Sequence, residues 1–194
     1  MASEEEERAR LRDRLGAGAR FDSSSAPASD LLLARRGTAY FARKLNELGD
    51  AELDWPSLVP GWTRRHVVAH VSYHARFLAR LAEAARNGRT VEILAEPESQ
   101  IEDVEFGATL PAHALRYLFN HSEVHLNVEW RDLDEKSWSA VIWTLEGKGV
   151  AVRDTPRLRA KEIWTRAVHL GNDGTPLDFP PALHMLMNLT DIAT

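Results

Sequence analysis

The stretch that decides the fold runs from Thr63 to Gly88 and reads TRRHVVAHVSYHARFLARLAEAARNG. Its apolar side chains recur every three or four residues, which is the period of one helix face. Thr63 stands where an N-cap is expected, and Asn87 with Gly88 supplies a helix stop. The segment therefore predicts an amphipathic helix that ends near Arg86. Its expected buried stripe consists of Val67, Val71, His74, Leu78, Leu81 and Ala85.

The rest of the chain adds helices and little sheet. Helical periodicity and helix-start signals predict helices at residues 30–48, 111–131, 157–170 and 182–192, with a short one at 99–106. Residues 138–152 are rich in apolar and β-branched side chains around a glycine-containing turn, so they predict a short β-hairpin or an extended connection. We therefore expect an all-α protein built as an antiparallel four-helix bundle.

The N-terminal residues differ from the rest in composition. Four consecutive acidic residues, 4–7, precede a series of arginines, and glycine, serine and proline follow before residue 28. An acidic run followed by a basic run is typical of a solvated helix face, and the glycines and serines indicate a flexible joint. We interpret residues 1–29 as a charged, flexible N-terminal extension and residues 30–194 as one helical domain.

The composition of the 194 residues excludes several function classes. The formal net charge of −5 gives no basic field for nucleic acid or an anionic membrane, so neither partner is expected. The absence of cysteine removes disulfides, thiolate ligands and a cysteine nucleophile, so thiol chemistry requires a thiol from outside. With no long apolar run and no secretion signal, the expected location is the cytoplasm.

Three histidines, His66, His70 and His74, follow one another at i, i+4 spacing on the helix that starts after Thr63. Residues four apart are separated by about 6 Å along a helix axis and about 40° around it, so His70 and His74 can point to one place. This is the spacing of a metal-binding pair. The pair predicts a metal or catalytic site, with a satisfied core histidine as the alternative. His66 is interpreted as a capping-box residue.

A polar line also runs along the predicted helix at residues 157–170. Glu162, Arg166 and His169 are spaced i, i+4 and i+7, so they share one face of an otherwise apolar helix. This pattern predicts a hydrated seam inside the bundle. The alternative is a simple ion pair between Glu162 and Arg166, which contributes about 0.2–0.5 kcal/mol. A second histidine line, His113, Tyr117, His121 and His125, lies in polar surroundings and is interpreted as a surface stripe.

Residues 58–71, LVPGWTRRHVVAHV, resemble the PGWT-x-x-x-VV-x-H signature of the mycothiol-dependent maleylpyruvate isomerase N-terminal domain family. Residues 159–171, RAKEIWTRAVHLG, are similar to that family's R-x-x-E-x-W-x-H-A-V-D-L-G helix. Residues 110–116, LPAHALR, are similar to the start of its third helix. The resemblance covers roughly residues 31–190 and implies a DinB-like bundle.

The resemblance implies a divalent metal, usually zinc, held by a histidine of the first signature and by a glutamate and a histidine on the late helix. By position these ligands fall on His70, Glu162 and Arg166, and arginine cannot ligate because it offers only donors. His74 and His169 replace the family's asparagine and aspartate. One alternative is a rearranged site of His70, His74, Glu162 and His169. The other is a metal-free pocket in which Arg166 pairs with Glu162 or holds an anionic substrate.

The resemblance also implies an activity. The family's isomerase uses a low-molecular-weight thiol such as mycothiol, which adds to the cis double bond of maleylpyruvate and leaves after rotation to give fumarylpyruvate. A metal ion lowers the pKa of such a thiol. The family's isomerases carry, in addition, a smaller C-terminal domain with a substrate-binding arginine. The implied function is a metal-dependent, thiol-cofactor-dependent isomerase or transferase acting on a small carboxylate.

Three hypotheses follow, and all of them need His70 and Glu162 to face each other across the bundle. In the first, these two residues hold a metal while His74 and His169 serve as substitute ligands or general bases, and Arg166 binds a carboxylate. In the second, the bundle is a non-catalytic binding or dimerisation module that has lost the metal site. In the third, a metal-free enzyme uses His74 as base and Arg166 as anion clamp. A homodimer is compatible with each hypothesis.

Overall fold

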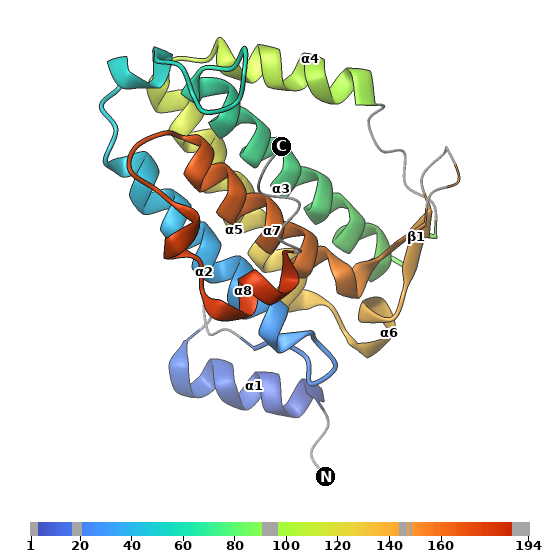
Figure 1. The fold of residues 1–194 in the computed structure, drawn as a ribbon. Coiled ribbons are helices and arrows are strands. Elements are labelled where there is room, and N and C mark those ends of the chain that lie inside the picture. The colour runs from blue at the N-terminus through green and yellow to red at the C-terminus, as the bar shows by residue number, and fades with distance from the viewer. Residues whose placement is uncertain (1–3, 17–20, 91–96, 144–146, 148, 188–194) are drawn as a thin grey trace.

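The protein is described from a computed structural model, which places residues 4–16, 21–90, 97–143, 147 and 149–187. Within these residues four long helices form a bundle, and each matches a predicted helix to within about two residues at either end (Figure 1). They are α2 (Ala28–Asn46), α3 (Arg64–Arg86), α5 (Ala112–Asp132) and α7 (Thr155–His169). The predicted all-α bundle is confirmed.

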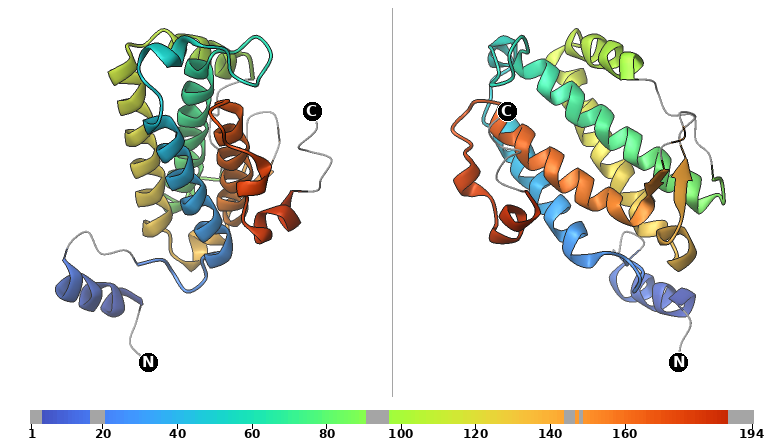
Figure 2. Two further views of the ribbon diagram at one scale, coloured as in Figure 1. Left: turned by 60° about the vertical axis from the view of Figure 1, so that its left-hand side comes forward. Right: turned by 45° about the vertical axis from the view of Figure 1, so that its right-hand side comes forward.

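Helices α2 and α7 run side by side in the same direction (Figure 2). Near the start of α2, the carbonyl of Leu33 accepts a hydrogen bond from Trp164 Nε1 at 3.0 Å. Near its end, Lys44 Nζ donates to the carbonyl of Asn172 at 3.2 Å. An early residue of α2 thus contacts α7, and a late residue of α2 contacts the segment just after α7, so the two helices are parallel.

Helices α3 and α5 form a second parallel pair, which runs opposite to the first. Arg65 Nη1 donates to the Leu110 carbonyl at 2.7 Å, and Arg86 Nε pairs with Glu129 Oε2 at 3.1 Å. A parallel pair requires the chain to return between its members. Helix α4 (Pro97–Ala108), which packs along α3, lies on this return path (Figure 1). The arrangement makes α3 and α7 antiparallel neighbours, which positions the site.

Shorter elements complete the described chain. They are α1 (Glu4–Leu15), η1 (Ala51–Asp54), α6 (Glu135–Trp138), β1 (Val141–Trp143), β2 (Gly149–Ala151), η2 (Val152–Asp154), η3 (Pro176–Asp178) and α8 (Pro181–Leu186). Of the two alternatives for residues 138–152, the hairpin is correct, since β1 pairs with β2 in antiparallel register with Ile142 opposite Val150. The last predicted helix begins as expected but ends at Leu186, and residues 188–194 lie outside the described residues.

The parallel helices α2 and α7 approach closely at Gly37. A Cβ atom added at this position would lie 2.5 Å from Ile163 Cγ2 and 2.7 Å from the Trp164 indole. The absence of a side chain therefore lets the α2 backbone rest directly on α7. Tyr40, one turn further along, stacks on Trp164 with 4.8 Å between ring centroids.

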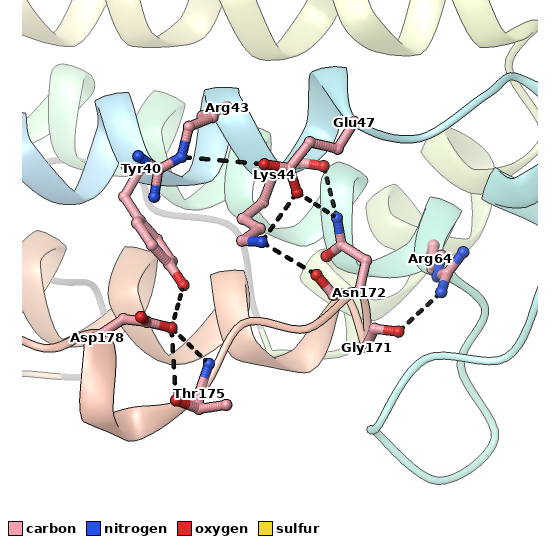
Figure 3. Close-up of polar contacts among 9 residues, drawn as sticks. All are labelled: Tyr40, Arg43, Lys44, Glu47, Arg64, Gly171, Asn172, Thr175 and Asp178. Carbon is pink, nitrogen blue, oxygen red and sulfur yellow. Dashed lines mark hydrogen bonds and ion pairs between the residues drawn. The ribbon is translucent and has the colours of Figure 1, made fainter.

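The segment after α7 is tied back to the bundle by polar contacts (Figure 3). Arg64, which is buried at the start of α3, donates from Nε to the Leu170 carbonyl at 2.7 Å and from Nη2 to the Gly171 carbonyl at 2.8 Å. These carbonyls belong to the helix end, where no intrahelical donor remains for them. Tyr40 Oη donates to Asp178 Oδ2 at 2.8 Å on the following η3 turn. The last turn of α7, which carries Arg166 and His169, is thereby fixed.

Candidate functional site

The antiparallel packing of α3 against α7 brings the first predicted pair together. His70 Nε2 and Glu162 Oε1 lie 2.7 Å apart, and both side chains remain partly exposed, at 27% and 23%. One nitrogen and one oxygen from stretches 92 residues apart therefore form a direct hydrogen bond. The sequence-based expectation that His70 and Glu162 face each other is correct.

The protonation of this pair follows from the surroundings of Glu162. Burial alone would raise the pKa of its carboxyl group, but the hydrogen bond from His70 and the neighbouring charge of Arg166 hold the pKa well below its usual value. An ionised carboxylate only accepts hydrogen bonds. The hydrogen between the two residues therefore belongs to His70 Nε2, and in the neutral form of this ring Nδ1 is the acceptor nitrogen.

Arg166 completes the cluster from the next turn of α7. Its Nε donates to the same Glu162 Oε1 at 2.6 Å, and its Nη1 donates to His169 Nδ1 at 3.2 Å. The guanidinium carbon lies 5.4 Å from the centre of the Trp62 ring, an attractive cation–π arrangement. Burial and then the Arg166 charge lower the pKa of His169. The predicted ion pair between Glu162 and Arg166 is thus present, inside a partly buried seam.

His74 is held apart from this cluster by a different arginine. Its Nδ1 lies 3.1 Å from Arg159 Nη1. Burial, followed by the positive charge of Arg159, lowers the pKa of His74 from 6.5 to about 3. His74 is therefore a neutral ring at physiological pH.

Arg159 itself lies in the centre of the bundle and is fully buried. Its Nη2 donates to Glu123 Oε1 of α5, and its Nη1 also donates to the Val71 carbonyl at 2.9 Å. The other Glu123 oxygen accepts from Thr38 Oγ1 of α2 at 3.0 Å. Side chains from all four long helices thus meet in one hydrogen-bonded network that ends on His74.

Sequence reasoning missed this network. Arg159 is predicted only as the first residue of a family motif, and Glu123 lies within the stretch interpreted as a polar surface stripe. A signal was present, because Arg159 and Ile163 are four residues apart on a helix whose other buried residues are apolar apart from Thr155. An arginine on such a face needs an acidic partner from another helix.

A cavity of about 410 Å³ opens beside His70 and His74, between α3 and α4. This volume lies within the range of small-molecule sites. Its lining also contains Tyr73, Arg76, Phe77, Arg80, Asp103, Val104 and Phe106. A larger hollow of about 560 Å³ lies between α2 and α5, and Thr38 and Glu123 are part of its wall.

The arrangement does not fit a metal ion. Among the residues that the structure describes, no three histidine, aspartate or glutamate side chains lie close enough together to hold one. Of the predicted ligands His70, Glu162, His169 and His74, only the first two meet, and each of the others directs Nδ1 at an arginine. A guanidinium that binds the Glu162 carboxylate competes with a divalent cation for the same lone pairs.

The remaining histidines have structural surroundings. His66 Nδ1 accepts from the Thr63 backbone N–H at 3.2 Å, which confirms the predicted capping box. His121, on the α5 line, is exposed, and His125 packs beside it at 6.3 Å between ring centroids. The predicted surface stripe is confirmed. His184 packs against Phe179 at 5.9 Å.

The arrangement of the four long helices as two parallel pairs defines the class of protein as a DinB-like four-helix bundle. The chain belongs to the mycothiol maleylpyruvate isomerase N-terminal domain family, whose model matches residues 34–171. No curated protein sequence matches the chain.

Solved structures agree with this assignment. A crystal structure of the mycothiol-dependent maleylpyruvate isomerase is similar at a TM-score of 0.77 and 37% identity over 82% of this chain and 66% of that one. A histidine-to-alanine variant of the isomerase gives a TM-score of 0.77 and 36% identity over the same shares, 82% and 66%. This chain therefore spans just under two thirds of the isomerase's length.

A more distant structure shows the fold alone. YfiT from Bacillus subtilis, described as a probable metal-dependent hydrolase with an unusual four-helix bundle topology, is similar at a TM-score of 0.57 and 14% identity. The match covers 75% of this chain and 82% of YfiT. Within the described part of this chain, no helix is both long enough and apolar enough to cross a membrane.

Proposed function

We propose that this chain is a maleylpyruvate isomerase-like enzyme that acts on a small carboxylate with a low-molecular-weight thiol such as mycothiol. In this proposal Arg166 supplies the positive charge at the site, and no divalent metal is needed. The observation that carries it is the 2.7 Å contact between His70 and Glu162, with Arg166 on the same carboxylate oxygen, beside a cavity of about 410 Å³.

His70 has the arrangement of a general base. Its Nε2–H is donated to Glu162, and Nδ1 has no hydrogen-bond partner among the described residues. A proton can therefore be taken up at Nδ1, and Glu162 stabilises the imidazolium that results. A thiol bound in the cavity would supply the nucleophile that a cysteine-free chain lacks. Membership of the family supports a thiol of this kind.

Arg166 has one nitrogen, Nη2, that can donate a hydrogen bond to an anion. Its Nη2 lies 3.4 Å from His70 Nε2, but that nitrogen already carries the hydrogen donated to Glu162. No other acceptor for Nη2 is found among the described residues. The guanidinium also lowers the pKa of any thiol that binds beside it, as a neighbouring cation does. Arg166 is thus suited to hold a carboxylate or a developing thiolate.

The test measures maleylpyruvate isomerisation by the full chain, with and without mycothiol, before and after treatment with a strong chelator. Thiol-dependent turnover that the chelator leaves unchanged is expected. His70→Ala should lower kcat by about 10²–10⁴-fold, the usual contribution of a general base. His125→Ala, on the surface stripe of α5, is the matched control and should leave kcat unchanged. Loss of turnover with the chelator, restored by zinc, would overturn the metal-free site.

A second candidate is a non-catalytic binding or dimerisation module. The observation in its favour is that the Glu162 carboxylate is already engaged by both His70 and Arg166. This version expects binding of thiol or carboxylate without turnover, or a stable dimer by sedimentation. It also expects His70→Ala to change neither assembly nor any reaction rate.

A further inference from the structure

We propose that Arg159 is a positioning residue, which orients the His74 ring so that its Nε2–H becomes a hydrogen-bond donor for a carboxylate in the cavity between α3 and α4. The inference rests on the proposed function for its ligand, a small carboxylate. It assigns His74 a role different from the metal ligand or general base that the sequence suggested.

The tautomer of His74 follows from the contact with Arg159. Guanidinium nitrogens only donate, so His74 Nδ1, 3.1 Å from Arg159 Nη1, must be the acceptor nitrogen. A neutral imidazole with an acceptor at Nδ1 carries its hydrogen on Nε2. A ring in this state cannot bind a metal through Nε2 and cannot take a proton at Nδ1 without losing the contact.

Arg159 can impose this state because it is itself immobilised. Its side chain is fully buried, and it donates both to Glu123 and to the Val71 carbonyl of α3, at 2.9 Å for the latter. Glu123 in turn is anchored by Thr38 Oγ1 at 3.0 Å. Burial lowers the pKa of Arg159 from 12.5 to about 9, which still leaves it a cation at neutral pH.

The charges around His74 keep its ring neutral. On α7 these are Arg159, Glu162 and Arg166, and on α3 the charge of His70 also acts on it. Glu123 of α5 is engaged by Arg159, and Asp103 of α4 lines the same cavity. Only carboxylates favour protonation of His74, and burial together with the adjacent Arg159 outweighs them.

The second nitrogen of His74, Nε2, is the donor that we assign to the ligand. His74 lines the cavity, and its Nε2 has no hydrogen-bond partner among the described residues. Arg76 and Arg80 line the same space together with one carboxylate, Asp103, so the cationic groups outnumber the anionic one and favour an anion. A neutral N–H at the wall of such a cavity adds direction to the attraction, because it binds an oxygen along one axis. His74 thus contributes recognition of one carboxylate oxygen.

The tautomer can be tested without any activity. Long-range ¹H–¹⁵N correlation spectra of the full chain, labelled in histidine, distinguish the two neutral tautomers and the imidazolium. His74 is expected as the neutral Nε2–H form at pH 6.

The variants test whether Arg159 imposes this form. Because Arg159→Met alone would leave the buried Glu123 carboxylate without its cation, the double variant Glu123→Gln with Arg159→Met is used, and Glu123→Gln alone is the matched control. The control should keep the tautomer, while the double variant should release it into a mixture that includes imidazolium. An Nδ1–H or protonated His74 in the unmodified chain would overturn the inference.

The donor role is tested separately by calorimetric titration with maleate, a small dicarboxylate. His74→Leu, which has no donor, should weaken maleate binding about tenfold, as the loss of one good hydrogen bond does. His74→Gln, whose amide can donate from a similar position, should retain most of the affinity. Equal affinity of His74→Leu and the unmodified chain would overturn the donor role. Failure of the unmodified chain to bind maleate would overturn the proposed ligand class, while the spectra would still decide what Arg159 does.

Discussion

Arg166 Nε donates a hydrogen bond to Glu162 Oε1 at 2.6 Å, and the two residues lie one helical turn apart on α7. The same oxygen lies 2.7 Å from His70 Nε2. A guanidinium therefore occupies the position in which the family resemblance requires a second imidazole. It brings one fixed positive charge to the carboxylate, whereas a metal ion would bring two and would need three or four ligands.

Replacement of this one residue should restore a metal site. Arg166→His places an imidazole four residues after Glu162 and opposite His70, so that two histidines and one carboxylate face one point. We expect the variant to retain about one zinc ion per chain after dialysis and to gain thermal stability in zinc. Elemental analysis with calorimetry measures both.

Arg166→Lys is the control for this experiment, because it keeps the positive charge and adds no ligand. It should bind no more zinc than the unmodified chain. Stoichiometric zinc in the unmodified chain would contradict the prediction, since it would mean that Arg166 moves away from Glu162 to admit the metal.

The lowered pKa of His74 has a consequence for stability. The pKa of His74 is about 3 in the folded chain, whereas the ordinary value is 6.5. Below pH 6.5, His74 therefore binds a proton in the unfolded chain and stays neutral in the folded chain. The contribution of His74 is complete above pH 6.5 and is lost as the pH falls. Between pH 7 and pH 5 the destabilisation caused by His74→Gln should therefore shrink by about 1–2 kcal/mol.

Urea unfolding of both proteins at the two pH values measures this difference. Other groups titrate in both proteins and cancel in the comparison. The opposite sign, a destabilisation that grows as the pH falls, would show that His74 is protonated in the fold and paired with Glu162 rather than governed by Arg159.

The sequence predicted the fold well because its signals are local. The helix after Thr63 and the hairpin around Gly147 depend on periodicity and turn residues, and both are found close to the expected bounds. The relative directions of the helices were harder to predict. Helices α3 and α5 run parallel, and no residue pattern within either helix indicates this. Only the position of α4 between them in the chain hinted at a return.

The site was predictable only in part. His70 and Glu162 carry a family signature, so their meeting could be expected. The partners of His74 could not, because the Arg159–Glu123 pair joins α7 to α5 and depends on how three helices pack. The partner of a buried charge can come from any other helix, so it is known only from the three-dimensional structure. The partner of a helix-capping residue lies three residues further along the chain and can be read from the sequence.

The close contact of α2 and α7 predicts an unusual response to alanine at Gly37. In a solvent-facing helix, glycine to alanine stabilises by about 0.4–1 kcal/mol. Here the new Cβ would lie 2.5 Å from Ile163 Cγ2, so we expect a loss of about 1–3 kcal/mol in the free energy of unfolding. Urea denaturation measures it. In an Ile163→Ala background the loss should become smaller, and a gain in stability for Gly37→Ala would contradict the packing described.

Arg64 is expected to stabilise the bundle through the end of α7. Its guanidinium fork donates to the carbonyls of Leu170 and Gly171 at 2.7 and 2.8 Å, and lysine cannot reach both with the same geometry. Arg64→Lys should lower the free energy of unfolding by about 1–3 kcal/mol, because it leaves a helix-end carbonyl without a donor. Arg157 is exposed, so Arg157→Lys is the control and should change the free energy of unfolding little.

Amide hydrogen exchange locates the change within the structure. The Leu58 N–H, which donates to the His169 carbonyl at 2.9 Å, should exchange faster in Arg64→Lys. Unchanged exchange at Leu58 would mean that Arg64 does not hold the last turn of α7, and with it Arg166, in place.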